Sequence, residues 1–264
     1  MKRKALAITL AAAMAMGTCA VTASAADGDK YTIGICQLVQ HEALDAATQG
    51  FKDEVTKELG EDAVTFDEQN AQGDSNTCST IINSFVSNNV DLILANATAP
   101  LQSAAAATTD IPILGTSVTD YATALDISDW SGTTGRNISG TSDLAPLSEQ
   151  AAMLNELFPD AKNVGLLYCS AEANSQYQID VIKEELEKLN YTCTAYSFVD
   201  SNDIASVVQS AVNDNDVLYV PTDNTAASNT EVINNIAGEA GVPIIAGEAG
   251  ICKGCGVATL SISY

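Results

Sequence analysis

The stretch Asp216 to Glu248, DVLYVPTDNTAASNTEVINNIAGEAGVPIIAGE, contains the unit from which the fold is built. Val217 to Val220 and Ile244 to Ala246 are short apolar runs, which predict buried strands. Ala226 to Ala240, between them, predicts a helix that ends at Gly241. Two strands separated by one helix indicate a parallel β-α-β unit.

The same alternation begins near the N-terminus. Its strands are short and apolar on both faces, which is typical of parallel sheets covered by helices on both sides. An irregular stretch from about Tyr121 to Gly135 interrupts it. The predicted strands of this first series are Tyr31–Leu38, Thr65–Gln69, Val90–Ala95, Ile113–Thr116 and Ile138–Ser142, and its predicted helices are Glu42–Leu59, Asn76–Ser87 and Pro100–Thr108.

A second series follows Pro146. Its predicted helices are Leu147–Phe158, Ser175–Leu189, Ile204–Asn213 and Ala226–Ala240, and its predicted strands are Val164–Tyr168, Thr192–Ser197, Val217–Val220, Ile244–Ala246 and Val257–Ile262. The two series together predict an α/β protein of two Rossmann-like lobes, each with a parallel sheet. The expected division is a signal peptide over residues 1–25, an N-terminal lobe over 26–141 and a C-terminal lobe over 142–264. The pattern does not give the strand order.

The first residues indicate export. Lys2, Arg3 and Lys4 precede an apolar run from Ala5 to Met16, and Ala23-Ser24-Ala25 supplies the small residues of a cleavage site. This is the layout of a secretory signal, and the apolar run is too short to span a bilayer.

Two processing routes remain open. The first is cleavage near Ala25, and the second is lipidation of Cys19, although Thr18 is bulky for the residue before such a cut. Either route predicts an exported protein, in the periplasm or as a lipoprotein at the cell surface. We expect contact with the membrane only on the second route, through a lipid anchor at Cys19.

The charge excludes several partners. Eight basic and 34 acidic residues follow Ala25, which gives a net charge of −26 for that part of the chain. So acidic a chain repels nucleic acid and anionic lipid, and no basic cluster offsets the repulsion. We therefore expect no nucleic-acid partner.

Catalytic and metal-binding patterns do not stand out. The chain has one histidine, His41, and neither a phosphate-binding loop nor a nucleophile elbow. Cys252 and Cys255 form a C-x-x-C flanked by glycines, which predicts a tight turn with either a loop-closing disulfide or two free thiols. The remaining cysteines of the lobes, Cys36, Cys78, Cys169 and Cys193, occur in surroundings typical of buried thiols. We expect no enzyme activity, cofactor or metal.

Polar residues follow nearly every predicted strand. In parallel sheets, ligands bind beyond the carboxyl ends of the strands, where helix N-termini present free N–H groups. Helix capping explains the same residue types, so each alone is ambiguous. The polar exits are Gln37 with His41-Glu42, Asn70–Asp74, Asn96-Ala97-Thr98, Ser117–Asp120, Ser170–Ser175, Pro221–Thr225 and Gly247-Glu248.

Several of these polar stretches also belong to a pattern of matches to a known family, which extends from Tyr31 to Tyr264. The matching stretches are Ile33–Gln37, His41–Asp45, Gly50–Asp53, Asn70–Asp74, Ala97-Thr98, Asp110–Ile113, Thr116–Asp120, Gly140–Asp143, Glu172–Ser175, Thr222–Thr225 and Ala258–Ile262. In this order the sequence resembles the substrate-binding proteins of ABC importers, of the tryptophan/tyrosine type.

The resemblance implies a periplasmic-binding-protein-like fold of type I that closes on a small amino acid, with an aromatic one favoured, and passes it to an ABC permease and ATPase. A ligand-sensing ectodomain and an exported α/β enzyme are the alternatives. Family members continue for several dozen residues beyond the position of Tyr264, so the C-terminal lobe is expected to be incomplete. The implied ligand contacts are Gln37, Glu42, Asn70, Thr98, Thr116, Ser142 and Asp143 in the first lobe and Glu172, Asn174, Ser175, Asp223, Asn224 and Glu248 in the second.

An amino acid zwitterion needs one site for each charge. Arg136 is the only arginine after residue 25 and lies in a glycine-rich stretch, so an arginine clamp is not expected. The α-carboxylate is instead expected on Thr98, Thr116 and helix N-terminal N–H groups. The α-ammonium suits Asp143 or Asp223. Tyr168 and Tyr177 are candidates to border the side chain, and Tyr168 equally suits the core.

Overall fold

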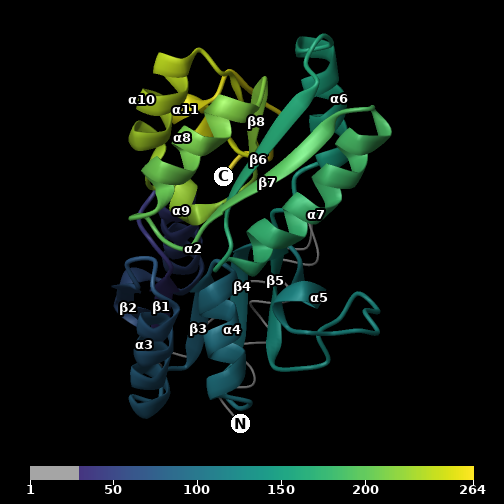
Figure 1. Ribbon diagram of the computed structural model, residues 1–264. Coiled ribbons are helices and arrows are strands. Elements are labelled where there is room, and N and C mark those ends of the chain that lie inside the picture. The colour runs from purple at the N-terminus through teal and green to yellow at the C-terminus, as the bar shows by residue number, and fades with distance from the viewer. Residues whose placement is uncertain (1–29) are drawn as a thin grey trace. The chain divides into compact units, whose positions relative to one another are not determined.

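The computed structural model describes residues 30–264, which form two compact units (Figure 1). The first unit contains the described residues up to Leu38 together with Leu44–Ser142. The second contains Val39–Ala43 together with Asp143–Tyr264. The predicted signal peptide and Cys19 lie outside the described residues.

The first unit has a five-stranded sheet in the order β2-β1-β3-β4-β5, and all its strands are parallel. The order agrees with the prediction of a parallel α/β fold and adds what the sequence pattern left open. Its strands are β1 (Tyr31–Gln37), β2 (Val64–Asn70), β3 (Leu92–Asn96), β4 (Ile113–Val118) and β5 (Ile138–Ser142), and its helices are α2 (Glu42–Leu59), the short 3₁₀ helix η1 (Glu61–Ala63), α3 (Ser75–Ser87), α4 (Thr98–Ala107) and α5 (Tyr121–Ala124).

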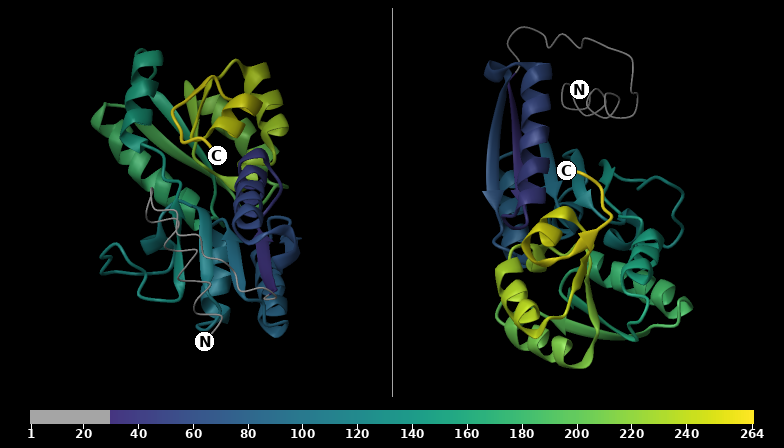
Figure 2. Two further views of the ribbon diagram at one scale, coloured as in Figure 1. Left: turned by 180° about the vertical axis from the view of Figure 1, so that it is seen from behind. Right: turned by 90° about the horizontal axis from the view of Figure 1, so that it is seen from above.

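Helices cover both faces of this sheet. On one face α2 places Val55 in a cluster with Ile33 and Ile35 of β1. On the opposite face α3 packs Phe85 against Gly34, where a side chain would have no room, and α4 lies beside α3. Figure 1 shows α3 and α4 in front of the sheet, and the view from behind in Figure 2 shows α2 on the other side.

The second unit also has a five-stranded parallel sheet, in the order β10-β9-β8-β6-β7. Side chains alternate along β6, so that Leu166 faces α6 and α7 while Leu167 faces α8 and α10. The strands are β6 (Asn163–Cys169), β7 (Thr192–Phe198), β8 (Val217–Val220), β9 (Ile244–Ala246) and β10 (Ala258–Thr259), and the helices are α6 (Leu147–Leu157), α7 (Ala173–Lys188), α8 (Ile204–Asp214), α9 (Asn224–Ala227), α10 (Thr230–Ala240) and α11 (Ala249–Cys255).

One predicted helix is divided in the structure. The sequence predicted a single helix from Ala226 to Ala240, but α9 ends at Ala227 and α10 begins at Thr230. The break has a local cause, since Ser228 Oγ and Asn229 Nδ2 both donate to the carbonyl of Thr225, at 3.1 and 2.8 Å. Such side-chain bonds compete with the helical backbone pattern.

The C-x-x-C stretch was predicted wrongly as a turn. Cys252 and Cys255 lie in α11 and are free thiols. Glu248 starts this helix by accepting hydrogen bonds from the N–H groups of Gly250 and Ile251. Ile251 is fully buried, so the cap and the packing outweigh the low helix propensity of the glycines.

The last predicted strand is much shorter than expected. The sequence predicted Val257 to Ile262, but only Ala258 and Thr259 pair with β9. The carbonyl of Leu260 accepts a hydrogen bond of 2.7 Å from Gln150 Nε2 and is thereby taken out of the strand ladder. Within residues 30–264, no helix has the length and apolarity needed to cross a bilayer.

Candidate functional site

The predicted contacts of the first unit lie at the ends of its strands. Because the strands are parallel, their carboxyl ends meet at one edge of the sheet. The register places Gln37 between Asn70 and Asn96, and Asn96 next to Thr116. The structure therefore brings the predicted residues Gln37, Asn70 and Thr116 into one row, which Asn96 completes.

Gln37 is held in place by a network of buried polar groups. Its Nε2 donates to Asp45 Oδ1 at 2.7 Å, and its Oε1 accepts from Thr48 Oγ1 at 2.7 Å. Asn96 Nδ2 donates to the same Thr48 oxygen at 2.9 Å and to the carbonyl of Leu44 at 2.8 Å. Side chains fixed in this way keep their geometry when a ligand arrives.

Asn96 is a residue that the sequence-based selection missed. It is fully buried, and its Oδ1 has no hydrogen-bond partner among the described residues. The signal was present, since Asn96 directly follows the apolar run of the third strand. It was passed over in favour of Thr98, two residues later.

Three of the six described residues other than glycine with positive φ lie at or beside this edge. Ala97, after β3, has φ of 101°, Ser117, in β4, has φ of 54°, and Gln72, after β2, has φ of 57°. Residues other than glycine adopt positive φ only at an energetic cost, and such residues gather at functional sites. The strain therefore marks three strand exits where the chain turns sharply.

Helix α4 presents a suitable anion site at this edge. It spans ten residues and begins at Thr98, which is buried. No side chain caps it, because Ala97 occupies the N-cap position. Backbone N–H groups at an uncapped helix N-terminus favour a negative charge.

Ser142 lies at the end of β5, the edge strand next to β4. Its Oγ donates to the carbonyl of Thr119 at 2.8 Å. Nearby, Tyr121 Oη donates to the carbonyls of Gly115 at 3.0 Å and Thr141 at 3.2 Å, where the pairing of β4 with β5 is irregular.

Glu172 organises the carboxyl edge of the second sheet. It is 8% exposed and follows β6. Its carboxylate accepts from Asn224 N at 3.0 Å, Asn224 Nδ2 at 2.6 Å, Thr225 N at 2.8 Å and Thr225 Oγ1 at 2.7 Å. Glu172 thus accepts hydrogen bonds from the first two residues of α9. One of them is Asn224, so the structure joins two of the predicted contacts, Glu172 and Asn224.

Asp223 lies beside this group and is 1% exposed. Its carboxylate accepts from the N–H groups of Cys169 at 2.6 Å and Ala226 at 2.8 Å. Burial, reinforced by the charge of Glu172, raises the pKa of Asp223 to about 7. A cation placed next to Asp223 would oppose both effects and favour its ionised form.

Asn174 and Ser175 lie in the first turn of α7, which begins at Ala173, two residues before the predicted start at Ser175. Asn174 Nδ2 donates to Glu172 Oε2 and to the carbonyl of Thr222, both at 3.2 Å. Gln178, one turn later and fully buried, donates to the same carbonyl and accepts from Thr222 N, both at 3.1 Å. Gln178 was missed, although its spacing from Asn174 places both on one helix face.

The other predicted residues have mixed surroundings. Glu248 is buried and caps α11. Asp143 is buried and accepts a hydrogen bond from Tyr264 Oη. The pKa of Tyr264 is raised mainly by burial, and the negative charge of Asp143 raises it further. Glu42 is exposed at the start of α2, and Tyr168 belongs to the core.

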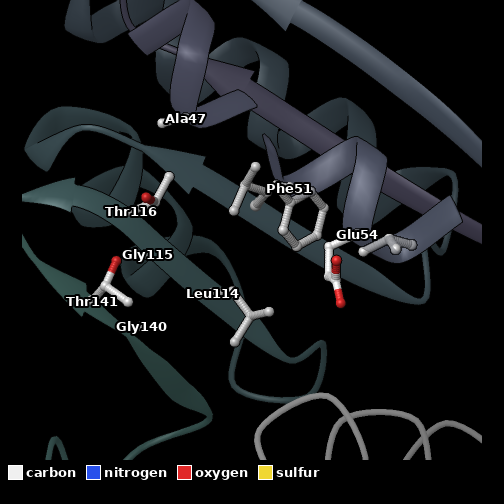
Figure 3. A pocket seen from close by; sticks show the side chains of 10 residues that line it. Ala47, Phe51, Glu54, Leu114, Gly115, Thr116, Gly140 and Thr141 are labelled. Carbon is white, nitrogen blue, oxygen red and sulfur yellow. The ribbon is translucent and has the colours of Figure 1, made fainter. Parts of the chain in front are cut away.

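An apolar pocket of about 260 Å³ lies in the first unit between α2 and strands β3 to β5 (Figure 3). Phe51 and Val55 approach it from α2, and Leu94 and Leu114 from the sheet. Glu54 is the only charged residue in its described lining. The pocket therefore does not suit the two charges of a free amino acid. A separate finding is that no group of three or more potential metal ligands occurs within residues 30–264.

Comparison with known proteins identifies the family of this chain. Residues 32–264 match the family described as ABC transporter substrate binding protein. The chain belongs to this family. It is 38% identical over 236 residues to the tyrosine-binding protein of Clostridioides difficile strain R20291, which covers 88% of this chain and 68% of the relative.

Two solved structures of substrate-binding proteins are similar as well. The ABC domain from Streptococcus pneumoniae in complex with L-Trp has a TM-score of 0.85 and 30% identity, over 89% of this chain and 80% of its own. The ligand-free, open structure of a substrate binding protein with adhesive properties from Clostridium difficile has a TM-score of 0.59 and 38% identity, over 85% and 77%.

These similarities confirm the predicted type I periplasmic-binding-protein-like fold and the role of a solute-binding component of an ABC importer. Members of this family act outside the cytoplasm, bind small molecules and cooperate with ABC transporter components.

Proposed function

We propose that this protein binds an aromatic amino acid, tyrosine or tryptophan first, and delivers it to the permease and ATPase of an ABC importer. The observation that supports this most is the 38% identity over 236 residues to a tyrosine-binding protein. The relative crystallised with L-Trp adds a second aromatic α-amino acid. The carboxyl edges of the two sheets offer the matching polar groups.

The N-terminus of α4 is the proposed site for the α-carboxylate. It offers uncapped N–H groups beside the buried Thr98, and Thr116 lies at the end of the neighbouring strand. This assignment needs no arginine, and Arg136 is already engaged with the carbonyl of Leu125, at 3.4 Å.

Asp223 is the proposed partner of the α-ammonium, with Asp143 as the competing candidate. Asp223 is a buried carboxylate whose negative charge is disfavoured without a nearby cation. Asn174, Asn224 and Glu172 fix its neighbourhood through hydrogen bonds. Gln37, Asn70, Ser142, Ser175 and Glu248 are proposed as further polar contacts, and Glu42 as a peripheral one.

Tyr177 is the proposed neighbour of the aromatic ring. It is half-buried on α7, three residues after Asn174 and therefore on the same side of the helix. Aromatic pairs contribute about 0.5–1.5 kcal/mol beyond area burial, so Tyr177→Ala should weaken tryptophan binding more than the binding of an aliphatic amino acid.

Titration calorimetry tests the proposal. The full chain should bind L-tyrosine or L-tryptophan at least tenfold more tightly than L-leucine or L-isoleucine. Asp223→Asn should reduce affinity by tenfold or more, because it removes the charge that pairs with the ammonium. Asp180→Asn, on the exposed side of α7, is the matched control and should bind as the unaltered protein does. Equal affinity for leucine, or unchanged binding by Asp223→Asn, would contradict the assignment.

We further propose that residues 1–25 act as the export signal, that the lobes span residues 26–141 and 142–264, and that the protein reaches the periplasm or is anchored through Cys19. The basic start and apolar run support export. The intact mass of the exported protein distinguishes the routes, since cleavage leaves Ala26 first and lipidation leaves an acylated Cys19.

A further inference from the structure

Cys36 and Cys78 are two buried cysteines that the proposed function does not use. Cys36 lies in β1 and Cys78 in α3, both within the first unit. Each is 0% exposed, and both are free thiols in the structure. Their arrangement depends on how α3 packs on β1.

The register of α3 on β1 follows from a close contact. Ile33 and Ile35 face the α2 side of the sheet, so the alternating residues Gly34 and Cys36 face α3. A Cβ atom at Gly34 would lie 2.6 Å from the ring of Phe85, which fixes Phe85 above Gly34.

The two cysteines lie further along the packing of α3 on β1, toward the N-terminus of the helix. Helix α3 connects the parallel strands β2 and β3, so it runs opposite to β1. Moving from Gly34 to Cys36 along the strand therefore leads from Phe85 toward the N-terminal turns of α3, where Cys78 lies two turns earlier on the same buried face. Cys78 and Phe85 are both buried on that face.

The two thiols are close enough to affect each other's pKa. A hydrogen bond between them raises the pKa of Cys36 and lowers the pKa of Cys78, with burial adding to the first effect and opposing the second. In thiol–disulfide exchange the thiolate is the nucleophile.

We propose that Cys36 and Cys78 form a disulfide bond when the exported chain folds. Members of this family act outside the cytoplasm, where disulfides persist. The oxidant is a small disulfide such as oxidised glutathione. The thiolate of one cysteine attacks one of its sulfur atoms and releases one thiolate, and the other cysteine then loses its proton and displaces the second. Two protein thiols are oxidised, and the small disulfide is reduced to two thiols.

The bond would brace the proposed binding edge. It joins the residue directly before Gln37 to the first turns of α3, which follows Asn70 and the turn to Asp74. Since both sulfur atoms are buried, the oxidant reaches them before α3 packs on the sheet. Once formed, the bond is protected from reductants by the same burial.

Peptide mapping tests the bond directly. The full chain is refolded from denaturant in a mixture of reduced and oxidised glutathione, its free thiols are alkylated, and it is cleaved with trypsin. Cys36 is the only cysteine of the peptide Tyr31–Lys52, and Cys78 the only one of Glu58–Arg136. We expect these two peptides to be joined, with a mass two hydrogen atoms below their sum, and to separate on reduction. Recovery of both as alkylated single peptides, or joined to other cysteines, would overturn the proposal.

Thermal unfolding supplies an independent measurement. A bond that closes a long loop should raise Tm by about 5 °C or more in the oxidised protein. Reductant should remove this gain, and Cys78→Ala should lack it. Cys193→Ala, on β7 in the second unit, is the control and should keep it. A Tm that reductant does not change in the unaltered protein, or a gain that persists in Cys78→Ala, would contradict the bond.

Discussion

Asp223 and Glu172 are neighbouring carboxylates at the carboxyl edge of the second sheet, and both are withdrawn from water. Glu172 has its charge distributed over four hydrogen bonds from Asn224 and Thr225. Asp223 accepts two backbone hydrogen bonds and carries the raised pKa. At the residue scale, the two side chains therefore have different tasks: Glu172 shapes the loop, and Asp223 provides a charge that depends on its surroundings.

Asp223 should make stability depend on pH. Its folded pKa of about 7 exceeds the ordinary value of 3.8, so the folded state binds the proton more tightly than the unfolded state. Stability should therefore fall as pH rises from about 4 to about 7, by at most roughly 1.4 kcal/mol per pH unit. Denaturant unfolding of the ligand-free protein across this range measures it.

Asp223→Asn is the control for this pH dependence and should flatten the curve over the same range. A ligand ammonium that pairs with Asp223 should in turn release a proton near pH 6, which calorimetry in buffers of different ionisation enthalpy detects. An equally steep curve in Asp223→Asn would show that another group titrates.

Glu172→Ala should destabilise the second unit by about 2–3 kcal/mol, because it leaves buried donors of Asn224 and Thr225 without an acceptor. Denaturant unfolding measures the change. Glu184→Ala, on the exposed side of α7, is the matched control and should change stability by less than about 0.5 kcal/mol. Equal effects of the two substitutions would contradict the role given to Glu172.

At the scale of elements, the sequence predicted the regular βα units well. α2, β5, β8 and β9 have the predicted bounds, because their apolar periodicity and end signals agree. The predictions failed where side chains redirect the backbone: at Asn229, which divides α9 from α10, and at Glu248, which starts α11 despite its glycines.

Many residues of the candidate site could also be predicted from the sequence, because the carboxyl ends of parallel strands lie together at one edge of the sheet. Its internal network was not. Whether Asn96 reaches Thr48, or Gln178 reaches Thr222, depends on the packing of residues far apart in the chain. Periodicity contains no information on such contacts, so it did not reveal what these two residues bind, although their positions after a strand and on one helix face with Asn174 were visible in the sequence.

The packing of α3 on β1 gives a prediction at this scale. Gly34→Ala should destabilise the protein by about 1–3 kcal/mol, because the added Cβ meets the ring of Phe85. Gly50→Ala has open space in α2 and should instead stabilise it by up to about 1 kcal/mol. Unfolding midpoints of both variants test the pair. A neutral Gly34→Ala would contradict the register that also places Cys36 against Cys78.

At the scale of the whole molecule, each of the two units combines a rigid parallel sheet with a polar carboxyl edge. The net charge of −26 after Ala25 disfavours phosphate-rich partners, and we expect recognition to depend on local groups at those edges. Binding proteins of this kind gain stability from their ligand, since a ligand that binds only the folded state shifts the unfolding equilibrium.

Thermal unfolding of the full chain against the twenty amino acids, several nucleosides and several sugars tests the central claim most directly. At about one hundred times its dissociation constant, a ligand should stabilise the folded state by roughly 2.7 kcal/mol, which moves Tm by several degrees. The account predicts such a shift with tyrosine, tryptophan or phenylalanine and little change with the other compounds. A cooperative transition that no aromatic amino acid moves, or that a sugar or nucleoside moves instead, would contradict it.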